Sequence, residues 1–394
     1  MAIPVLFFPQ VLVGASLLVF LGIVFYNLGH LKFLKANPNE SQISPSSLTT
    51  FPKVSILIPA RNEEAVIENC IRSLATLDYP NFEIIALNDH SSDKTGAILD
   101  SLSREVNNLT VINGLRLPEG WMGKCWACHQ LFIKSSGELL LFTDADTIHH
   151  PHSLKRAVTT LFEEKADMLT AIPFQIMNSF WEKQGVPLIH LLIMAFLPLA
   201  QIWRSKNEAF AFACGQYLLF TRIAYERSGG HESVKNALVE DVWLVKQVKR
   251  SGGKPMVFNG IDAVSCRMYD SFEGVWKGFS KNLFAGVGYN TLGMIAILSL
   301  FAVIFLSPIV TLIALSIANP FPSQLEFIPP VLNIIIALLI RTLIAWRFQL
   351  PVISQTIYPI SIMLFIGIGF NSIRWIKFGS GAEWKGRTYN FSKN

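Results

Sequence analysis

Hydrophobic residues dominate three long stretches of the chain that contain no Asp, Glu, Lys or Arg. These stretches are residues 1–31, 282–325 and 348–373. A helix needs roughly 20 apolar residues to cross a bilayer, so residues 1–31 predict an N-terminal transmembrane anchor. They lack the basic start and the small-residue cleavage site of a signal peptide. Residues 32–50 then predict a linker, and residues 51–280 predict a water-soluble domain.

The C-terminal third predicts a transmembrane region over residues 281–373 and a basic tail over residues 374–394. Its candidate spans are 292–317, 329–347 and 351–371. Because Arg341, Arg347 and Pro351 interrupt the last two candidates, the region predicts two or three helices. Three spans after the anchor would place the C-terminus outside the cell, whereas the basic tail favours the inside. The number of spans therefore stays open.

Composition and charge agree with a membrane protein. Hydrophobic residues make up 51% of the 394 residues and charged residues only 15%, a balance typical of membrane-embedded chains. Lys32 and Lys35 directly follow the first span, which predicts that the central domain lies in the cytoplasm. The five cysteines lack the density of a disulfide scaffold. We therefore expect a multi-pass protein of a bacterial-type cell membrane.

Short apolar runs alternate with segments of helical spacing in the first part of the central region. The runs that predict strands are 54–59, 82–87, 109–112 and 138–142, and the segments that predict helices are 63–77, 93–102 and 123–135. Alternating strands and helices form a mostly parallel sheet that is covered on both faces. The sequence therefore predicts an α/β domain whose ligands bind beyond the carboxyl ends of its strands.

Polar clusters follow three of these strands. Residues 59–63 follow the first strand, Asp89 follows the second, and residues 144–146 (Asp-Ala-Asp) follow the fourth. Two carboxylates at a sheet edge suit a hard divalent cation with bound phosphates. A second acidic pair at residues 240–241 (Glu-Asp) precedes a helical segment and could supply a base. The clusters predict chemistry on a nucleoside diphosphate.

Two other features allow more than one interpretation. Residues 125–129 (Cys-Trp-Ala-Cys-His) match the pattern of c-type haem attachment. Covalent haem requires export, which conflicts with a cytoplasmic domain, so we interpret this motif as a buried helix face. The apolar stretch 186–202 is short and contains prolines. We interpret it as an interfacial or core helix that could dip into the bilayer, the alternative being an ordinary buried helix.

In their order and spacing, these motifs resemble the family 2 glycosyltransferases of the GT-A fold. The matching segments are Val54–Glu64, Asn88–Thr95, Gly123-Lys124 with Ala127, Thr143–Asp146, Glu240-Asp241 and Trp384–Arg387. The resemblance implies a GT-A domain with a nucleotide-sugar donor at the carboxyl ends of its strands. Residues 213–216 (Ala-Cys-Gly-Gln) are expected to approach the sugar closely, because Gly lets a backbone come near a ligand.

The resemblance also implies roles for single residues. The residues implied to bind the nucleotide-sugar are Pro59, Arg61, Glu63, Asp89, Lys124, Asp144, Trp384 and Arg387. Asp146, together with Asp144, is implied to hold a Mg²⁺ or Mn²⁺ ion that bridges the donor phosphates. Asp241, with Glu240 beside it, is implied to be the base that takes the acceptor proton.

Plain structural roles stay open for several of these residues. Asp89 could cap the next helix, although Asp93 is the better candidate for that cap. Glu63 could be only an acidic residue at a helix start, and the C-terminal pair Trp384 and Arg387 could be an interfacial anchor. One of three neighbouring histidines, His149, His150 and His152, could complete the metal shell, and their role stays open.

The implied function is inverting, metal-dependent transfer of one sugar from a nucleotide-sugar, by default a UDP-sugar, to a hydroxyl of a membrane lipid. The pattern most resembles hopanoid-associated, carotenoid and ceramide-type enzymes. The expected partners are the donor, the lipid acceptor and the bilayer, with no nucleic acid. Residues 276–286 lack the Gln/Arg-x-x-Arg-Trp motif of a processive polysaccharide synthase, the first alternative. A non-catalytic transporter or scaffold would carry acidic or polar residues in its spans, where we note only Arg341.

Overall fold

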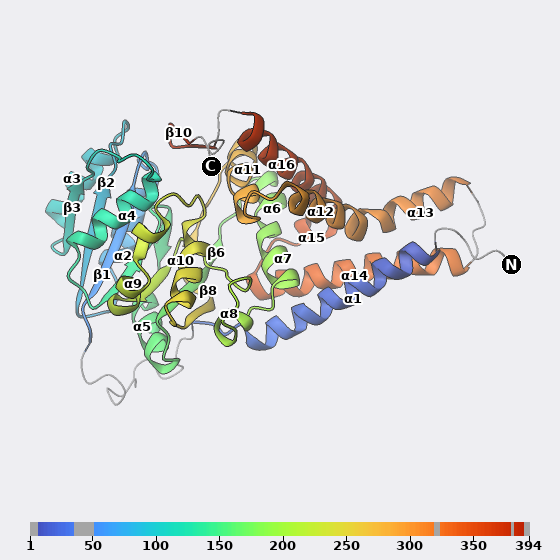
Figure 1. Ribbon diagram of the computed structural model, residues 1–394, viewed down its shortest axis with the longest axis horizontal. Coiled ribbons are helices and arrows are strands. Elements are labelled where there is room, and N and C mark those ends of the chain that lie inside the picture. Colours follow the sequence, from blue (N-terminus) through green and yellow to red (C-terminus); the bar gives the residue numbers. More distant parts are fainter. Residues whose placement is uncertain (1–6, 35–50, 319–323, 380–381, 390–394) are drawn as a thin grey trace. The chain divides into compact units, whose positions relative to one another are not determined.

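The computed structural model describes residues 7–34, 51–318, 324–379 and 382–389 (Figure 1). The chain forms two compact units, which we call the sheet unit and the helical unit. The sheet unit comprises Leu31–Ile176 and Ala200–Met268, and the helical unit comprises Met1–His30, Met177–Leu199 and Tyr269–Asn394. Most of the predicted linker 32–50 and the end of the predicted tail 374–394 lie outside the described residues.

The core of the sheet unit is a curled, mixed sheet of eight strands in the described part of the chain. The strands are β1 (Val54–Ala60), β2 (Phe82–Asn88), β3 (Leu109–Asn113), β4 (Leu139–Phe142), β5 (Thr147–His149), β6 (Met168–Gln175), β7 (Leu218–Thr221) and β8 (Pro255–Cys266). Their order is β3-β2-β1-β4-β7-β6-β8-β5. The predicted parallel arrangement is confirmed for β3, β2, β1 and β4. β7 runs antiparallel to both β4 and β6, so the other half of the sheet is mixed.

Continuous burial explains why the parallel strands lie in the interior. Ile56, Leu57 and Ile58 are consecutive residues of β1, and all three are fully buried. Because consecutive side chains of a strand point to opposite faces, both faces of β1 must be covered. The helices of this unit are α2 (Ile67–Ala75), α3 (Thr95–Glu105), α4 (Gly123–Lys134), α5 (Ser153–Glu163), α8 (Gln201–Arg204), α9 (Arg222–Arg227), the 3₁₀-helix η2 (Gly230–Val234) and α10 (Glu240–Arg250).

The starts of two helices differ slightly from the predicted ones. α2 begins at Ile67, because the Glu63 carbonyl accepts the N–H groups of Val66 and Ile67 in a turn. α3 begins at Thr95, whose N–H donates to Asp93 Oδ1 over 2.9 Å. Asp93 therefore accepts a backbone donor at the start of α3, although the residue at the N-cap position is Lys94, whose side chain makes no capping bond.

Among its described residues, the helical unit contains four helices that are long and apolar enough to cross a membrane. These candidate spans are Phe8–His30, Thr291–Ile317, Glu326–Phe348 and Tyr358–Phe378. The helices of the unit are α1 (Phe7–His30), α6 (Phe180–Gly185), α7 (Pro187–Phe196), α11 (Phe272–Gly286), α12 (Thr291–Phe301), the π-helix η3 (Ala302–Leu306), α13 (Ser307–Ala318), α14 (Gln324–Phe348), α15 (Ile353–Thr356) and α16 (Tyr358–Phe378). The spans are consistent with a membrane-associated protein.

Uncharged polar side chains link three of the long helices. Gln10 of α1 donates from Nε2 to Thr311 Oγ1 of α13 over 2.9 Å. Asn333 of α14 donates from Nδ2 to Gln10 Oε1 over 3.0 Å, and α1 and α14 lie side by side (Figure 1). The expectation that Arg341 is the one polar residue within the spans is therefore wrong. Amides are tolerated there because they bond to each other across helices.

The apolar stretch 186–202 contributes α7 to the helical unit. α7 packs against α1 and α14, and most of its residues are buried. Asn27 of α1 fixes the end of this stretch, because its Oδ1 accepts the Leu199 N–H over 2.8 Å. This burial agrees with a core helix and equally with the alternative of an ordinary buried helix, and a dip into the bilayer stays a prediction.

The C-terminal Trp-Lys-Gly-Arg segment forms a β-hairpin of β9 (Ala382–Trp384) and β10 (Arg387–Tyr389). Lys385 and Gly386 join the strands with φ values of 47° and 76°, as the turns of tight hairpins require. The hairpin belongs to the helical unit, and the side chain of Trp384 lies outside the described residues. Nucleotide contacts of Trp384 and Arg387 stay predictions.

Candidate active site

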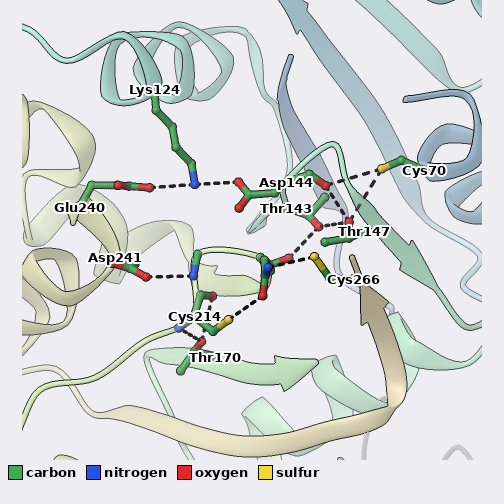
Figure 2. Close-up of polar contacts among 12 residues, drawn as sticks. Cys70, Lys124, Thr143, Asp144, Thr147, Thr170, Cys214, Glu240, Asp241 and Cys266 are labelled. Atoms are coloured by element: carbon green, nitrogen blue, oxygen red, sulfur yellow. Dashed lines mark hydrogen bonds and ion pairs between the residues drawn. The ribbon is translucent and has the colours of Figure 1, made fainter. Parts of the chain in front are cut away.

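One lysine joins the two acidic clusters. Lys124 Nζ lies 2.7 Å from Asp144 Oδ1 and 2.9 Å from Glu240 Oε1 (Figure 2). Lys124 lies in the first turn of α4, Asp144 follows β4 and Glu240 begins α10. Burial favours the neutral amine, but the two carboxylates outweigh burial and hold the pKa of Lys124 well above its ordinary value. The charged lysine therefore connects two consecutive elements, α4 and the end of β4, with α10, which lies much later in the chain.

Hydroxyl groups fix the loop that carries Asp144. Thr143 Oγ1 donates to the Gln216 carbonyl over 2.8 Å, and Thr147 Oγ1 donates to the Asp144 carbonyl over 2.7 Å (Figure 2). His149 Nε2 lies 3.0 Å from Thr143 Oγ1. Burial lowers the pKa of His149 to about 3, so its ring is neutral. His149 therefore supports the loop from the interior.

Asp146 has an oxygen atom that the fold leaves unsatisfied. Its Oδ1 is buried and has no hydrogen-bond partner. Burial, followed by the charges of Asp144 and Glu63, raises the pKa of Asp146. A bound cation would satisfy this oxygen and reduce the repulsion among the carboxylates.

The donor set around Asp146 is incomplete for a metal ion. Among the described residues, no group of three or more His, Cys, Asp or Glu side chains could hold an ion. Mg²⁺ commonly binds through one or two carboxylates together with substrate phosphates, and carboxylate oxygens also suit Mn²⁺. Asp144 and Asp146 therefore fit either ion when a diphosphate supplies further ligands.

Asp241 lies in the first turn of α10 and is held by backbone N–H groups. Its Oδ2 accepts the Gly215 N–H over 3.1 Å, and its Oδ1 accepts the Val242 N–H over 2.8 Å. Burial, followed by the adjacent charge of Glu240, raises the pKa of Asp241 to about 7. A carboxylate with such a pKa can take a proton from a hydroxyl near neutral pH.

A loop before β7 brings its backbone between the acidic clusters. The Cys214 N–H donates to Thr170 Oγ1 over 2.9 Å, and this hydroxyl donates to the Cys214 carbonyl over 3.2 Å (Figure 2). A Cβ atom at Gly215 would lie 3.2 Å from Lys124 Nζ and 3.6 Å from Asp241 Oδ2. Gly215 thus keeps open the space next to the predicted base.

The predicted nucleotide-binding residues of the first two strands lie at the carboxyl edge of the sheet. Pro59 is part of β1, and Asp89 directly follows β2. Arg61 Nη1 donates to the Asp89 carbonyl over 2.6 Å, and the Glu63 N–H donates to a threonine hydroxyl at the start of α3. The structure brings these residues to one edge, and their contacts with a nucleotide stay predictions.

Cys266 and Thr170 belong to this site, although the sequence did not single them out. Cys266 Sγ lies 2.9 Å from Gln216 Nε2, and burial raises the pKa of the Cys266 thiol, which stays neutral. A strand-end cysteine and a mid-strand threonine carry no sequence signal of chemistry. The order of β6, β7 and β8 in the sheet places them here.

The Cys-x-x-Cys-His motif is a buried face of α4. Cys125 and Cys128 are buried, and Cys125 Sγ donates to the Val234 carbonyl over 3.5 Å. Burial raises the pKa of both thiols. The interpretation of the motif as a helix face is confirmed.

The curled mixed sheet, with an Asp-x-Asp turn after β4 and an acidic start of α10, agrees with the GT-A fold. Residues 55–229 match the sequence model of Glycosyl transferase family 2. The chain therefore carries a domain of this family and is a glycosyltransferase.

Known proteins resemble the chain over most of its length. It is 25% identical over 344 residues to a 4,4'-diaponeurosporenoate glycosyltransferase of Staphylococcus haemolyticus, covering 86% of this chain and 89% of that protein. It is 23% identical over 346 residues to the enzyme of the same name from Staphylococcus aureus strain MRSA252, with the same coverage. A solved structure of a Pyrobaculum calidifontis mannosyltransferase in complex with GDP-Man and Mn²⁺ matches with a TM-score of 0.54 at 18% identity, covering 91% of this chain and 98% of that chain. The similarity to this solved structure supports the GT-A fold.

Proposed function

We propose that this enzyme transfers a single sugar from a nucleotide-sugar to a membrane lipid, with inversion at the anomeric carbon and with Mg²⁺ or Mn²⁺. The observation that carries the proposal is the joining of Asp144 and Glu240 by Lys124, with Asp241 next to them. Four candidate membrane spans support a lipid acceptor. The proposed donor is a UDP-sugar by default.

On the donor side, Asp144 and Asp146 would hold the divalent cation. When bound, the ion neutralises the negative charge that develops on the leaving diphosphate. The Lys124 ammonium lies beside Asp144 and adds a second positive charge on this side of the site. The residues proposed to hold the nucleotide-sugar are Pro59, Arg61, Glu63, Asp89, Lys124, Asp144, Trp384 and Arg387.

On the acceptor side, Asp241 removes the hydroxyl proton as the acceptor oxygen attacks the anomeric carbon. A new bond forms between that oxygen and the anomeric carbon, on the face opposite the leaving group. The bond from this carbon to the phosphate oxygen breaks, and the nucleoside diphosphate leaves with the bonding pair. Glu240 is paired with Lys124, whereas Asp241 is held by neutral N–H groups. Asp241 is therefore the better base of the two.

A lipid carboxylate is a second candidate acceptor, which the name of two relatives favours. The ending of 4,4'-diaponeurosporenoate denotes a carboxylate. A carboxylate is already ionised at neutral pH, so its glycosylation needs no base. In that reaction a protonated Asp241, with its raised pKa, would donate a hydrogen bond to the acceptor. A hydroxyl acceptor and a carboxylate acceptor therefore predict opposite effects of pH on the rate of sugar transfer.

We also propose that the chain spans a bacterial cell membrane several times, with the sheet unit in the cytoplasm. The proposed nucleotide contacts of Trp384 and Arg387 need the tail on the same side, which requires that two of the three C-terminal candidate helices cross the membrane. Lys32 and Lys35 directly follow the first span, and basic residues favour the cytoplasmic side. The cysteines of the chain are all free, as a reducing compartment favours.

Mass spectrometry of membrane lipids tests the proposed function. Extracts of cells with the gene, without it, and with the Asp241→Asn variant would be compared. We expect one lipid to gain the mass of a single sugar only in cells with the active gene. A long polymer would support the processive alternative, and identical lipid profiles would contradict the proposal.

A further inference from the structure

The helical unit contains a buried guanidinium that pairs with no carboxylate among the residues that the structure describes. Arg341 of α14 is 2% exposed. Its Nη2 donates to the Ser354 carbonyl over 2.6 Å, whereas its Nε and Nη1 have no hydrogen-bond partner. Within the described part of the chain, Arg341 makes no ion pair. Most of the five N–H groups of this side chain therefore lack an acceptor.

The short helix α15 holds the single acceptor of Arg341 in place. Ser354 Oγ donates to the Pro351 carbonyl over 2.7 Å, and Gln355 Nε2 donates to Ser354 Oγ over 2.6 Å. Ser354 and Gln355 are both buried. These bonds orient the backbone at Ser354. Because the Ser354 carbonyl accepts a hydrogen bond from Arg341, they also fix the position of the guanidinium.

A second unpaired donor comes from α16. Tyr358 is the first residue of this helix, and its ring centre lies 5.7 Å from Arg341 Cζ. The Tyr358 hydroxyl is buried and has no hydrogen-bond partner. The N-terminal end of a helix also carries partial positive charge. The guanidinium of α14 and the ring of α16 are thus neighbours, and each of these two side chains has a buried donor without a partner.

A buried charge and buried donors without acceptors destabilise a fold unless an anion binds to them. Arg341 and Tyr358 lie in the candidate spans Glu326–Phe348 and Tyr358–Phe378, where water is not available to replace missing acceptors. A charged residue inside a span commonly marks a functional site. Arg341 lies roughly 10 Å along the helix axis from the end of α14. The head of an amphiphile can reach this depth while its chain stays in apolar surroundings.

We propose that Arg341 and Tyr358 bind the oxyanion of a membrane amphiphile, namely a carboxylate or a phosphate at the end of an apolar chain. An oxyanion offers several acceptor oxygens to the guanidinium and forms charge-assisted hydrogen bonds with it. The Tyr358 hydroxyl supplies a further neutral hydrogen bond. An amphiphile with a neutral head leaves the buried charge unpaired and binds more weakly. The site does not depend on the sugar-transfer reaction.

Three probes with the same twelve-carbon chain test this proposal. Dodecanoate, dodecyl phosphate and dodecanol would be titrated into the full-length protein in a non-ionic detergent, with binding measured by calorimetry. The variants are Arg341→Gln and Tyr358→Phe. Arg374→Gln changes an exposed arginine of α16 in the same way and is the matched control.

We expect an anionic probe to bind the unchanged protein on the order of 10-fold more tightly than dodecanol. Arg341→Gln should weaken that binding on the order of 10- to 100-fold, Tyr358→Phe should weaken it less, and Arg374→Gln should have no effect. The preferred anion distinguishes a carboxylate from a phosphate head. Equal binding of all three probes to the unchanged protein overturns the proposal, as does anion binding that Arg341→Gln leaves intact. If Arg341→Gln does not fold, the order in which the three probes bind the unchanged protein and the effect of Tyr358→Phe still test the proposal.

Discussion

Gly215 holds Asp241 through its backbone, because the Gly215 N–H donates to Asp241 Oδ2 over 3.1 Å. A side chain at the same position would project between the acidic clusters, with its Cβ atom 3.6 Å from Asp241 Oδ2 and 3.2 Å from Lys124 Nζ. One residue therefore both orients the predicted base and keeps the adjacent space open.

Gly215→Ala should leave the protein folded and impair sugar transfer. The nearest atom is the flexible end of Lys124, so the fold can accommodate a methyl group. A displaced substrate should lower kcat/KM by roughly 10- to 100-fold, measured with a labelled nucleotide-sugar. Gly286→Ala is the matched control, because a Cβ atom there would meet no atom within 4 Å. Equal losses in both variants would show that the space next to Gly215 is not used.

Lys124→Ala should weaken both donor binding and the fold. Removal of the ammonium leaves the buried Glu240 without its partner, which should lower the free energy of unfolding by about 1–3 kcal/mol. The KM for the donor should rise because positive charge near Asp144 is lost. Lys124→Arg should restore part of both properties, whereas Lys134→Ala, at the exposed end of the same helix, should change neither. Thermal unfolding in detergent and donor titrations measure these effects.

Asp146→Asn should abolish metal-dependent donor binding without unfolding the protein. Asparagine has nearly the same shape as aspartate and removes one charge from the cluster with Asp144 and Glu63. Calorimetry with UDP should detect binding to the unchanged protein only when Mg²⁺ or Mn²⁺ is present, and chelation should remove it. UDP binding that neither chelation nor Asp146→Asn alters would show that these carboxylates hold no metal.

The rate of transfer to a hydroxyl acceptor should rise with pH. The pKa of Asp241 is raised to about 7 by burial and then by Glu240, and a base acts only when it is deprotonated. Below this pH, kcat should therefore fall about tenfold for each pH unit. A carboxylate acceptor predicts the opposite trend, because the protonated Asp241 would then be the useful form. Initial rates between pH 5.5 and 8.5 separate the two acceptors, and a flat profile would exclude a titrating role for Asp241.

The sequence predicted those features that depend on neighbours along the chain. The apolar run 138–142 and the acidic residues after it identified the end of β4, and β1, β2 and β4 begin within one residue of their predicted starts. The polar edge was predictable too, because parallel strands share the edge at which they end.

Features that depend on distant pairing were not predictable from one sequence. The bridge from Asp144 through Lys124 to Glu240 joins a strand end and two helix starts, and no spacing encodes it. The antiparallel pairing of β7 with β4 and β6 is also non-local. Gln10 and Asn333 were overlooked because an uncharged amide does not interrupt an apolar run, although the two side chains bond to each other.

The most direct test of the proposed transferase compares the unchanged protein with Asp241→Asn. Both would be given a labelled nucleotide-sugar and the lipid acceptor found by mass spectrometry, and the formation of glycolipid would be measured at pH 7.5. For a hydroxyl acceptor, Asp241→Asn should lower kcat by roughly 10²- to 10⁴-fold and leave the KM for the donor nearly unchanged. Asp100→Asn, on the exposed surface of α3, should keep full activity. Full transfer by Asp241→Asn would contradict the assignment of the base.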